Sequence, residues 1–291
     1  MAKKEVSSKT PPSSGKPRRT AADTGGEAQE AYRLPGLPGY ALIPGDPNRI
    51  RLMVSQWDPG AKEYEFSRRY AGAIGRYKDV PISAFSTGIG APSTEWVLNG
   101  LAANKVHTFI RVGTTGTLQK NIKTGDLIIN DAAVRMDGTS NLYVRPEYPA
   151  AASYEVTLAL IQAAENLGFR YHLGVGYTAG SFFTGQCRTL YNGYRPAALD
   201  AEFSDMQQAR VLNFEMEAAA VFTLARLLGA RSGMCAAVVA HRITGEWDSG
   251  GEGEKKACLA AAEAVRIISG WDLKKKKAKK AYYFPGLENL K

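Results

Sequence analysis

Short apolar runs typical of β-strands alternate with amphipathic, helix-like segments along most of this chain. Such an alternation predicts one α/β domain with a largely parallel sheet, because parallel strands need helical crossovers between them. Strands are expected over residues 40–46, 80–90, 106–116, 126–138, 172–179 and 233–240, and helices over residues 92–104, 153–168, 213–228 and 254–271.

The positive charge of the chain is concentrated at its two ends. The net charge is +9, and residues 1–20 and 271–291 each carry +5, so the 250 residues between them carry −1. We expect a disordered basic tail over residues 1–30, a domain over 31–272 and a basic extension over 273–291. The run "KKKKAKK" suits RNA, an acidic membrane surface or an import receptor, or serves as a solubilising helical extension. The near-neutral body argues against a specific nucleic-acid partner.

Apolar runs and cysteines bear on where the protein resides. No apolar run approaches the roughly 20 residues that span a bilayer, and no signal peptide is recognisable. The three cysteines have no C-x-x-C spacing, and the three histidines are scattered. We therefore expect a soluble cytoplasmic protein with reduced thiols, no membrane partner, no bound metal and no cofactor.

Three of the expected strands end in glycine-containing turns that carry a hydroxyl or a charge. These are "PGDPNR" with Arg49, "STGIGAPS", and "RVGTTG" with Arg111 and Thr114. Ligands of open α/β sheets bind beyond the carboxyl ends of strands, and guanidinium groups match phosphate oxygens. Together the turns predict a phosphate site, although each alone is more typical of an ordinary turn with a surface arginine. None is a Walker A or G-x-G-x-x-G loop.

Two further stretches carry polar groups suited to a nucleoside. In "GSFFTGQCRTLY", an extended backbone would turn Gln186 and Arg188 to the same side, beside two phenylalanines. An amide and a guanidinium suit a flat heterocycle with N–H and C=O groups, whereas a solvated loop is the plainer alternative. In "NFEMEAAAVF", Glu215 and Glu217 would face different directions on a helix. One of them could accept hydrogen bonds from vicinal hydroxyls, or both could merely complement the helix dipole.

The motifs "IPGDPNR", "STGIGAPS", "FIRVGTTG", "FFTGQCR", "NFEMEAAAVF" and "VVAHR" occur together in one order and spacing. In this the chain resembles the nucleoside phosphorylase superfamily, from Tyr32 to the final helix. The Gln-x-Arg pair is similar to that of the uridine phosphorylase branch. The resemblance implies a single-domain, three-layer α/β fold with a mostly parallel, partly barrel-like sheet flanked by helices. It also implies the reaction uridine + phosphate ⇌ uracil + ribose 1-phosphate, with phosphate as co-substrate.

The family pattern implies a role for each matching residue. Phosphate would be bound by Gly45, Arg49, Arg111 and Thr114 of one subunit and by Arg68 of "SRRY" from its neighbour. Ribose would be bound by Met216, Glu217 and Arg33, and the base by Phe182, Gln186, Arg188 and Arg242. The catalytic residues would be Gln186, Arg188, Arg111 and Glu217.

Two departures from the family pattern and several alternatives stay open. Arg33 in "YRLPG" stands where relatives carry a histidine that reaches the ribose 5′-hydroxyl bound by the neighbouring subunit. Arg69 stands where they carry a cation-ligating glutamate, which implies that no potassium is needed because a guanidinium cannot ligate a cation. The donated Arg68 implies at least a dimer, with a hexamer as the alternative. Preference among uridine, deoxyuridine and thymidine is not settled.

Three other functions are weighed against uridine phosphorolysis. A purine nucleoside phosphorylase would place an aspartate after the last core strand, where "VVAHRITGEW" has none before Asp248. A hydrolytic nucleosidase would not need the phosphate arginines. An inactive homologue that binds a partner through its basic tails is opposed by the intact motifs.

Overall fold

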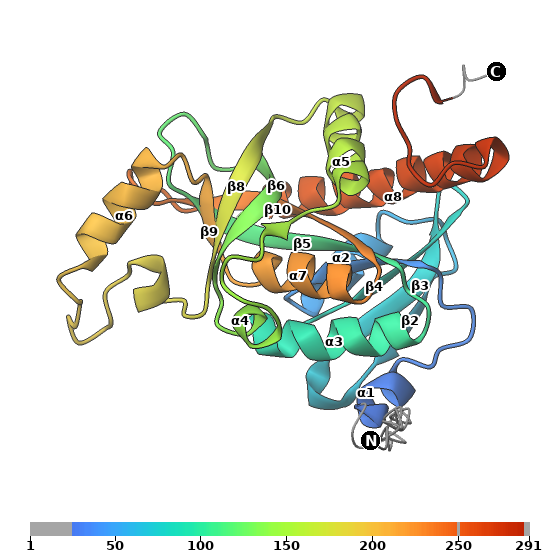
Figure 1. Ribbon diagram of the computed structural model, residues 1–291, viewed down its shortest axis with the longest axis horizontal. Helices are drawn as coiled ribbons and strands as arrows, with labels where there is room; N and C mark the ends of the chain where they lie inside the picture. Colours follow the sequence, from blue (N-terminus) through green and yellow to red (C-terminus); the bar gives the residue numbers. More distant parts are fainter. Residues whose placement is uncertain (1–24, 249–250, 288–291) are drawn as a thin grey trace, which may run out of the picture.

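The computed structural model describes residues 25–248 and 251–287, which form one α/β unit around a ten-stranded sheet (Figure 1). The strands are β1 (Tyr40–Pro44), β2 (Lys62–Glu65), β3 (Ala71–Tyr77), β4 (Val80–Phe85), β5 (Thr108–Thr117), β6 (Leu127–Met136), β7 (Ala150–Ala151), β8 (Tyr171–Ala179), β9 (Asn213–Glu215) and β10 (Arg231–His241). The helices are α1 (Gly26–Ala31), α2 (Asn48–Val54), α3 (Ala91–Ala103), α4 (Ser140–Tyr143), α5 (Tyr154–Leu167), α6 (Leu199–Gln208), α7 (Ala218–Leu227) and α8 (Glu252–Ala278).

The sheet closes on itself over part of its width. Its strands follow the order β10-β6-β8-β9-β5-β1-β4-β3-β2, and β10 also pairs with β5, so five strands form a ring. Strands β4, β1, β5 and β10 run parallel, whereas β3 and β6 are antiparallel to their neighbours in this series. The expected α/β class with a partly barrel-like sheet is therefore confirmed, and the sheet is mixed.

Helices cover both faces of the sheet, and the alternation of side chains along β1 shows why. Leu42 packs in a core with α2, α5 and α8, while its neighbours Ala41 and Ile43 pack in a second core with α3 and α7. Successive strand residues point to opposite faces, so a run of apolar residues is buried on both sides. Figure 1 shows these helical layers, with α3 on one side of the sheet and α5 and α8 on the other.

Three expectations about local structure differ from the structure. Residues 213–228 are not one helix: Asn213–Glu215 forms β9, and α7 begins only at Ala218. The end of the expected disordered tail is folded, because Gly26–Ala31 forms α1 and Ala28 is buried. The tail up to residue 24 lies outside the described residues. The border expected at residues 272/273 falls inside α8, which continues through the first lysines of the basic run.

No helix in the described ranges is long and apolar enough to cross a membrane.

Candidate active site

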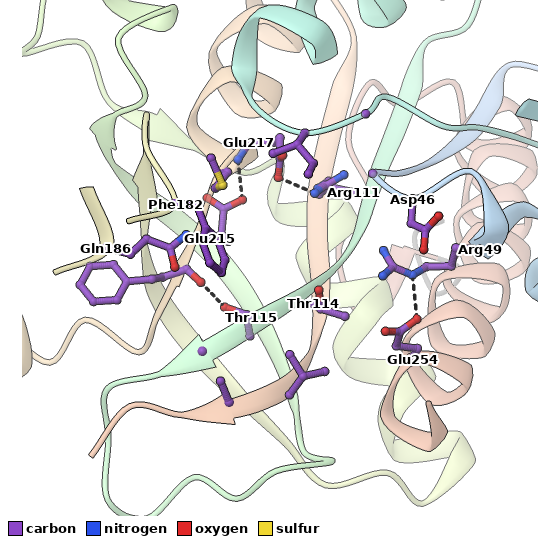
Figure 2. A pocket seen from close by; sticks show the side chains of 18 of the residues that line it. Asp46, Arg49, Arg111, Thr114, Thr115, Phe182, Gln186, Glu215, Glu217 and Glu254 are labelled. Atoms are coloured by element: carbon purple, nitrogen blue, oxygen red, sulfur yellow. Dashed lines mark hydrogen bonds and ion pairs between the residues drawn. The ribbon is translucent and has the colours of Figure 1, made fainter. Parts of the chain in front are cut away.

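A cavity of about 560 Å³ lies at the carboxyl ends of β1, β5, β9 and β10 (Figure 2). Side chains converge there because the parallel strands β1, β5 and β10 end at the same edge of the sheet, and the short antiparallel strand β9 pairs with the last residues of β5. The predicted site residues that line this cavity are Gly45, Arg49, Arg111, Thr114, Phe182, Gln186, Arg188, Met216 and Glu217. The structure therefore brings together most of the residues singled out from the sequence.

Two buried arginines mark one end of the cavity. Arg49 donates from Nη1 to the carbonyl oxygen of Val112 at 3.2 Å and from Nε to Glu254 Oε2 at 3.2 Å. Arg111 donates to the carbonyl oxygen of Ile43 at 3.3 Å and forms an ion pair with Glu217. Guanidinium groups held this firmly present their remaining N–H groups in fixed directions, as recognition of a tetrahedral anion requires.

Gly45 lets the backbone approach this end of the cavity closely. A Cβ atom at Gly45 would lie 3.1 Å from the carbonyl oxygen of Gly88 and 3.3 Å from Arg111 Nη1. A side chain there would crowd the guanidinium, so the close approach requires glycine.

Glu217 lies between the two ends of the cavity. It directly follows the short strand β9 and Met216, and its Oε1 accepts a hydrogen bond from the backbone N–H of Gly90 at 2.6 Å. Its Oε2 contacts Arg111. The carboxylate is buried, so it is held in one place and offers its remaining lone pairs to hydroxyl groups in the cavity.

Glu215 is a site residue that the sequence did not assign. Its carboxylate accepts hydrogen bonds from the backbone N–H groups of Glu217 and Ala218, both at 2.8 Å, and from the hydroxyl of Thr178. Burial and the charge of Glu217 raise the pKa of Glu215 to about 7. Its role is to hold the junction between β9 and α7, and thereby the position of Glu217.

The other end of the cavity carries the Gln-x-Arg pair. The expected extended backbone is wrong here, because Thr184–Gln186 forms a 3₁₀ turn and Cys187 adopts a left-handed conformation with φ of 54°. Gln186 and Arg188 nevertheless both line the cavity, and the Arg188 guanidinium lies 4.6 Å from the ring centre of Phe182. Cys187 is buried in a separate apolar cluster, as expected for a structural thiol.

Arg242 lies behind this end rather than in the lining. Its guanidinium lies 5.4 Å from the ring centre of Phe214, and its stem packs against Gly116, where a Cβ atom would lie 3.1 Å from Arg242 Cδ. Burial and the charge of Arg188 lower the pKa of Arg242 to about 10. Nε of Arg188 and Nη1 of Arg242 are buried without a hydrogen bond. Within the described residues, neither arginine has a carboxylate partner.

Three predicted residues lie elsewhere. Arg33 is exposed after α1, 3.3 Å from Glu30, and Arg68 and Arg69 belong to a 3₁₀ turn between β2 and β3. Since Arg33 and Arg68 are expected to serve a neighbouring subunit, their roles stay predictions. The residues that line the cavity but were not assigned a role are Asp46, Pro47, Gly88, Ile89, Thr115, Gly116, Phe214, Glu215, Val239, Ala240, Trp247 and Glu254. All of them except Glu254 lie within stretches quoted above, whereas nothing local pointed to Glu254.

The described residues contain no group of three or more His, Cys, Asp or Glu side chains that could hold a metal ion. The expectation that the protein uses neither a metal nor a cofactor stays a prediction.

Comparison with known proteins agrees with this geometry. The family described as the phosphorylase superfamily matches residues 40–269. The uridine phosphorylase of Thermococcus kodakarensis is 51% identical over 260 residues, which cover 88% of this chain and 93% of that protein. The uridine phosphorylase of Escherichia coli is 36% identical over 71% of this chain and 81% of its own length. The guanosine phosphorylase of Halorubrum lacusprofundi is 32% identical over 78% and 90%. The chain is a member of the phosphorylase superfamily.

Proposed function

We propose that this protein is a uridine phosphorylase, a pentosyltransferase that converts uridine and phosphate reversibly into uracil and ribose 1-phosphate. The observation that carries the proposal is the pair of half-buried guanidinium groups of Arg188 and Arg242: each has one buried nitrogen without a hydrogen bond, and within the described residues neither has a carboxylate partner. Burying cations without a counter-ion is costly unless a ligand supplies negative charge. A departing uracil, which takes up the electron pair of the broken bond, supplies that charge at this end of the cavity.

Three sets of cavity residues bind the phosphate, the ribose and the base. Arg49, Arg111 and Thr114 hold phosphate, which attacks C1′ of the sugar while the bond from C1′ to the base nitrogen breaks. Glu217 accepts hydrogen bonds from the ribose hydroxyls. Gln186 and Arg188 bind the carbonyl oxygens of the base, and these bonds strengthen as negative charge develops, which stabilises the transition state selectively. No side chain has to act as nucleophile, which agrees with the buried position of Cys187.

A purine substrate is the second candidate, because one relative of similar coverage is named guanosine phosphorylase. The stretch after β10 argues against it, since the strand ends at His241, Arg242 follows it, and the aspartate that would protonate a purine nitrogen does not occur before Asp248. The uridine phosphorylases of Thermococcus kodakarensis and Escherichia coli are also more similar to this chain than the guanosine phosphorylase is.

A phosphate-dependent assay separates these candidates. Uridine, deoxyuridine, thymidine and inosine are each incubated with the protein, with and without phosphate, and release of free base is measured. We expect base release from uridine only with phosphate. Release from inosine but not uridine would favour the purine enzyme, release without phosphate a nucleosidase, and no release from any nucleoside an inactive homologue that binds a partner.

We further infer an assembly of at least two subunits, in which Arg68 and Arg33 of one subunit complete the site of the next. The cytoplasm is the proposed location, supported by three free, buried cysteines. Because Arg69 carries a fixed positive charge where the family pattern implies a cation-ligating glutamate, we expect turnover without potassium. Uridine turnover is compared in potassium and in tetramethylammonium buffers of equal ionic strength, and a steep dependence on potassium would refute this inference.

A further inference from the structure

Arg49 forms an ion pair with the carboxylate of Glu254 inside the proposed phosphate site. Glu254 reaches from the first turn of α8, and its Oε2 lies 3.2 Å from Arg49 Nε, while Arg49 Nη1 is bonded to the backbone. Figure 2 shows this contact at the end of the cavity that carries Thr114. Glu254 also lines the cavity, and about a third of its side chain is exposed. A negative charge therefore stands beside the place where an anion is expected to bind.

The shape of the guanidinium fixes how close that anion comes to Glu254. The Nε–H bond and one Nη2–H bond run parallel and form a fork for two acceptor oxygens. Glu254 occupies the Nε side, and within the described residues Nη2 has no hydrogen bond. An anion oxygen on Nη2 would lie next to Glu254 Oε2, at about the 2.5–3.0 Å typical of an O–H···O bond.

Two oxygens at that distance are compatible only if a proton lies between them. Phosphate at neutral pH keeps one P–OH group, which donates to the carboxylate. Sulfate has lost both protons, so its oxygen would meet the carboxylate with like charge and no hydrogen bond. We propose that Glu254 is a specificity-determining residue that selects a protonated oxyanion, phosphate, over a fully ionised one, sulfate. This rests on the proposed function, because it assumes that an oxyanion binds Arg49.

The same contact orients the phosphate for reaction. With its P–OH group turned toward Glu254, the ionised oxygens face the rest of the cavity, including the sugar. One of these oxygens forms the bond to C1′ as the bond from C1′ to the base breaks, and the proton stays on the phosphate. Glu254 thus favours the reactive orientation without accepting a proton.

The first test uses the unmodified full-length protein. Uridine turnover is measured with varied phosphate and with sulfate as competitor, ionic strength being held constant with chloride. We expect the inhibition constant of sulfate to exceed the KM for phosphate by about tenfold or more, the factor that one charge-assisted hydrogen bond supplies. Arsenate, which also keeps a proton, should replace phosphate as co-substrate. Sulfate inhibition at concentrations near the phosphate KM would overturn the proposal.

The second test changes only the charge. In Glu254→Gln the amide can donate to a fully ionised oxygen, so the ratio of the sulfate inhibition constant to the phosphate KM should fall about tenfold. Glu252→Gln is the matched control, because Glu252 lies in the same helical turn but pairs with Lys255 on the surface, outside the cavity. It should leave the ratio unchanged. An unchanged ratio in Glu254→Gln would refute the role of Glu254.

Calorimetric titration of the protein with phosphate and with sulfate tests the selectivity of Glu254 independently of the proposed uridine phosphorylase activity. If uridine is not turned over but phosphate binds much more tightly than sulfate, and Glu254→Gln removes that difference, the proposed function fails and the selectivity stands. If uridine is turned over but sulfate binds as tightly as phosphate, the selectivity fails and the function stands.

Discussion

At the scale of single residues, the base end of the cavity is unusual because its two cations have no carboxylate partner within the described residues. Burial lowers the pKa of Arg188, and the charge of Arg188 contributes to the lowered pKa of Arg242. We expect Arg188→Ala to reduce uridine turnover by about 10²–10³-fold, the typical loss when one donor to a developing negative charge is removed. The phosphate KM should change little, because Arg49 and Arg111 lie at the other end. Steady-state kinetics with each substrate varied checks both values.

A matched change shows whether the loss is specific. Arg51 lies on α2 and is exposed, so Arg51→Ala removes the same charge and should leave turnover as it is. Uridine turnover that survives Arg188→Ala would show that the base lies elsewhere in the cavity. A rise in the phosphate KM as large as the fall in uridine turnover would show that the change distorts the whole site.

At the scale of elements, the junction between β9 and α7 depends on the buried carboxylate of Glu215. The pKa of Glu215 rises from 4.5 to about 7 on folding, so the folded protein binds this proton more tightly than the unfolded chain. The stability that this proton contributes is present below about pH 4.5 and is lost as the pH rises through 7. Glu215→Gln does not titrate, so its melting temperature should rise relative to that of the native protein between about pH 5 and pH 8.

Thermal melts at a series of pH values, with uridine turnover as a check on folding, test this effect. Glu165→Gln is the control, since Glu165 is exposed on α5 and should show no such trend. A difference between Glu215→Gln and the native protein that stays constant over this pH range would contradict the raised pKa.

The same junction shows where sequence reasoning reaches its limit. The alternation of strands and helices predicts the α/β class, whereas the partly barrel-like sheet and the nine assigned residues of the cavity lining follow from the family resemblance that the motifs carry. Strand β9 was missed because Asn213–Glu215 is short and precedes residues with high helix propensity, while its pairing with β5 and β8 is decided by distant strands. The role of Glu254 could not be predicted from the sequence either, because Glu254 contacts Arg49 from 205 residues further along the chain.

At the scale of the whole molecule, the C-terminal basic run is partly built into the fold. Lys275 lies 2.7 Å from Glu155, which also pairs with Arg231 and accepts the backbone N–H of Tyr283 at 2.8 Å. The ring of Tyr283 stacks on Trp271 at 4.2 Å, and Leu287 is buried. Removing residues 274–291 to test a binding role of the basic extension would therefore expose part of the core as well. Single substitutions separate the two roles.

The network around Lys275 lies at the amino ends of β1, β5 and β10, at the opposite edge of the sheet from the cavity. Only 11% of the Lys275 side chain and 5% of the Glu155 side chain are exposed, so Lys275→Ala leaves a buried carboxylate with one cation fewer. We expect a loss of about 1–3 kcal/mol in the free energy of unfolding, less than for a fully unpaired charge because Arg231 remains. Lys277→Ala, on the exposed side of α8, should cause no measurable loss in the free energy of unfolding.

Denaturant melts give the free energies of unfolding, and uridine turnover should be the same in both variants. Equal stability of the two variants would show that the run is only a solvated extension, and a selective loss of turnover in Lys275→Ala would show that the two edges of the sheet are coupled.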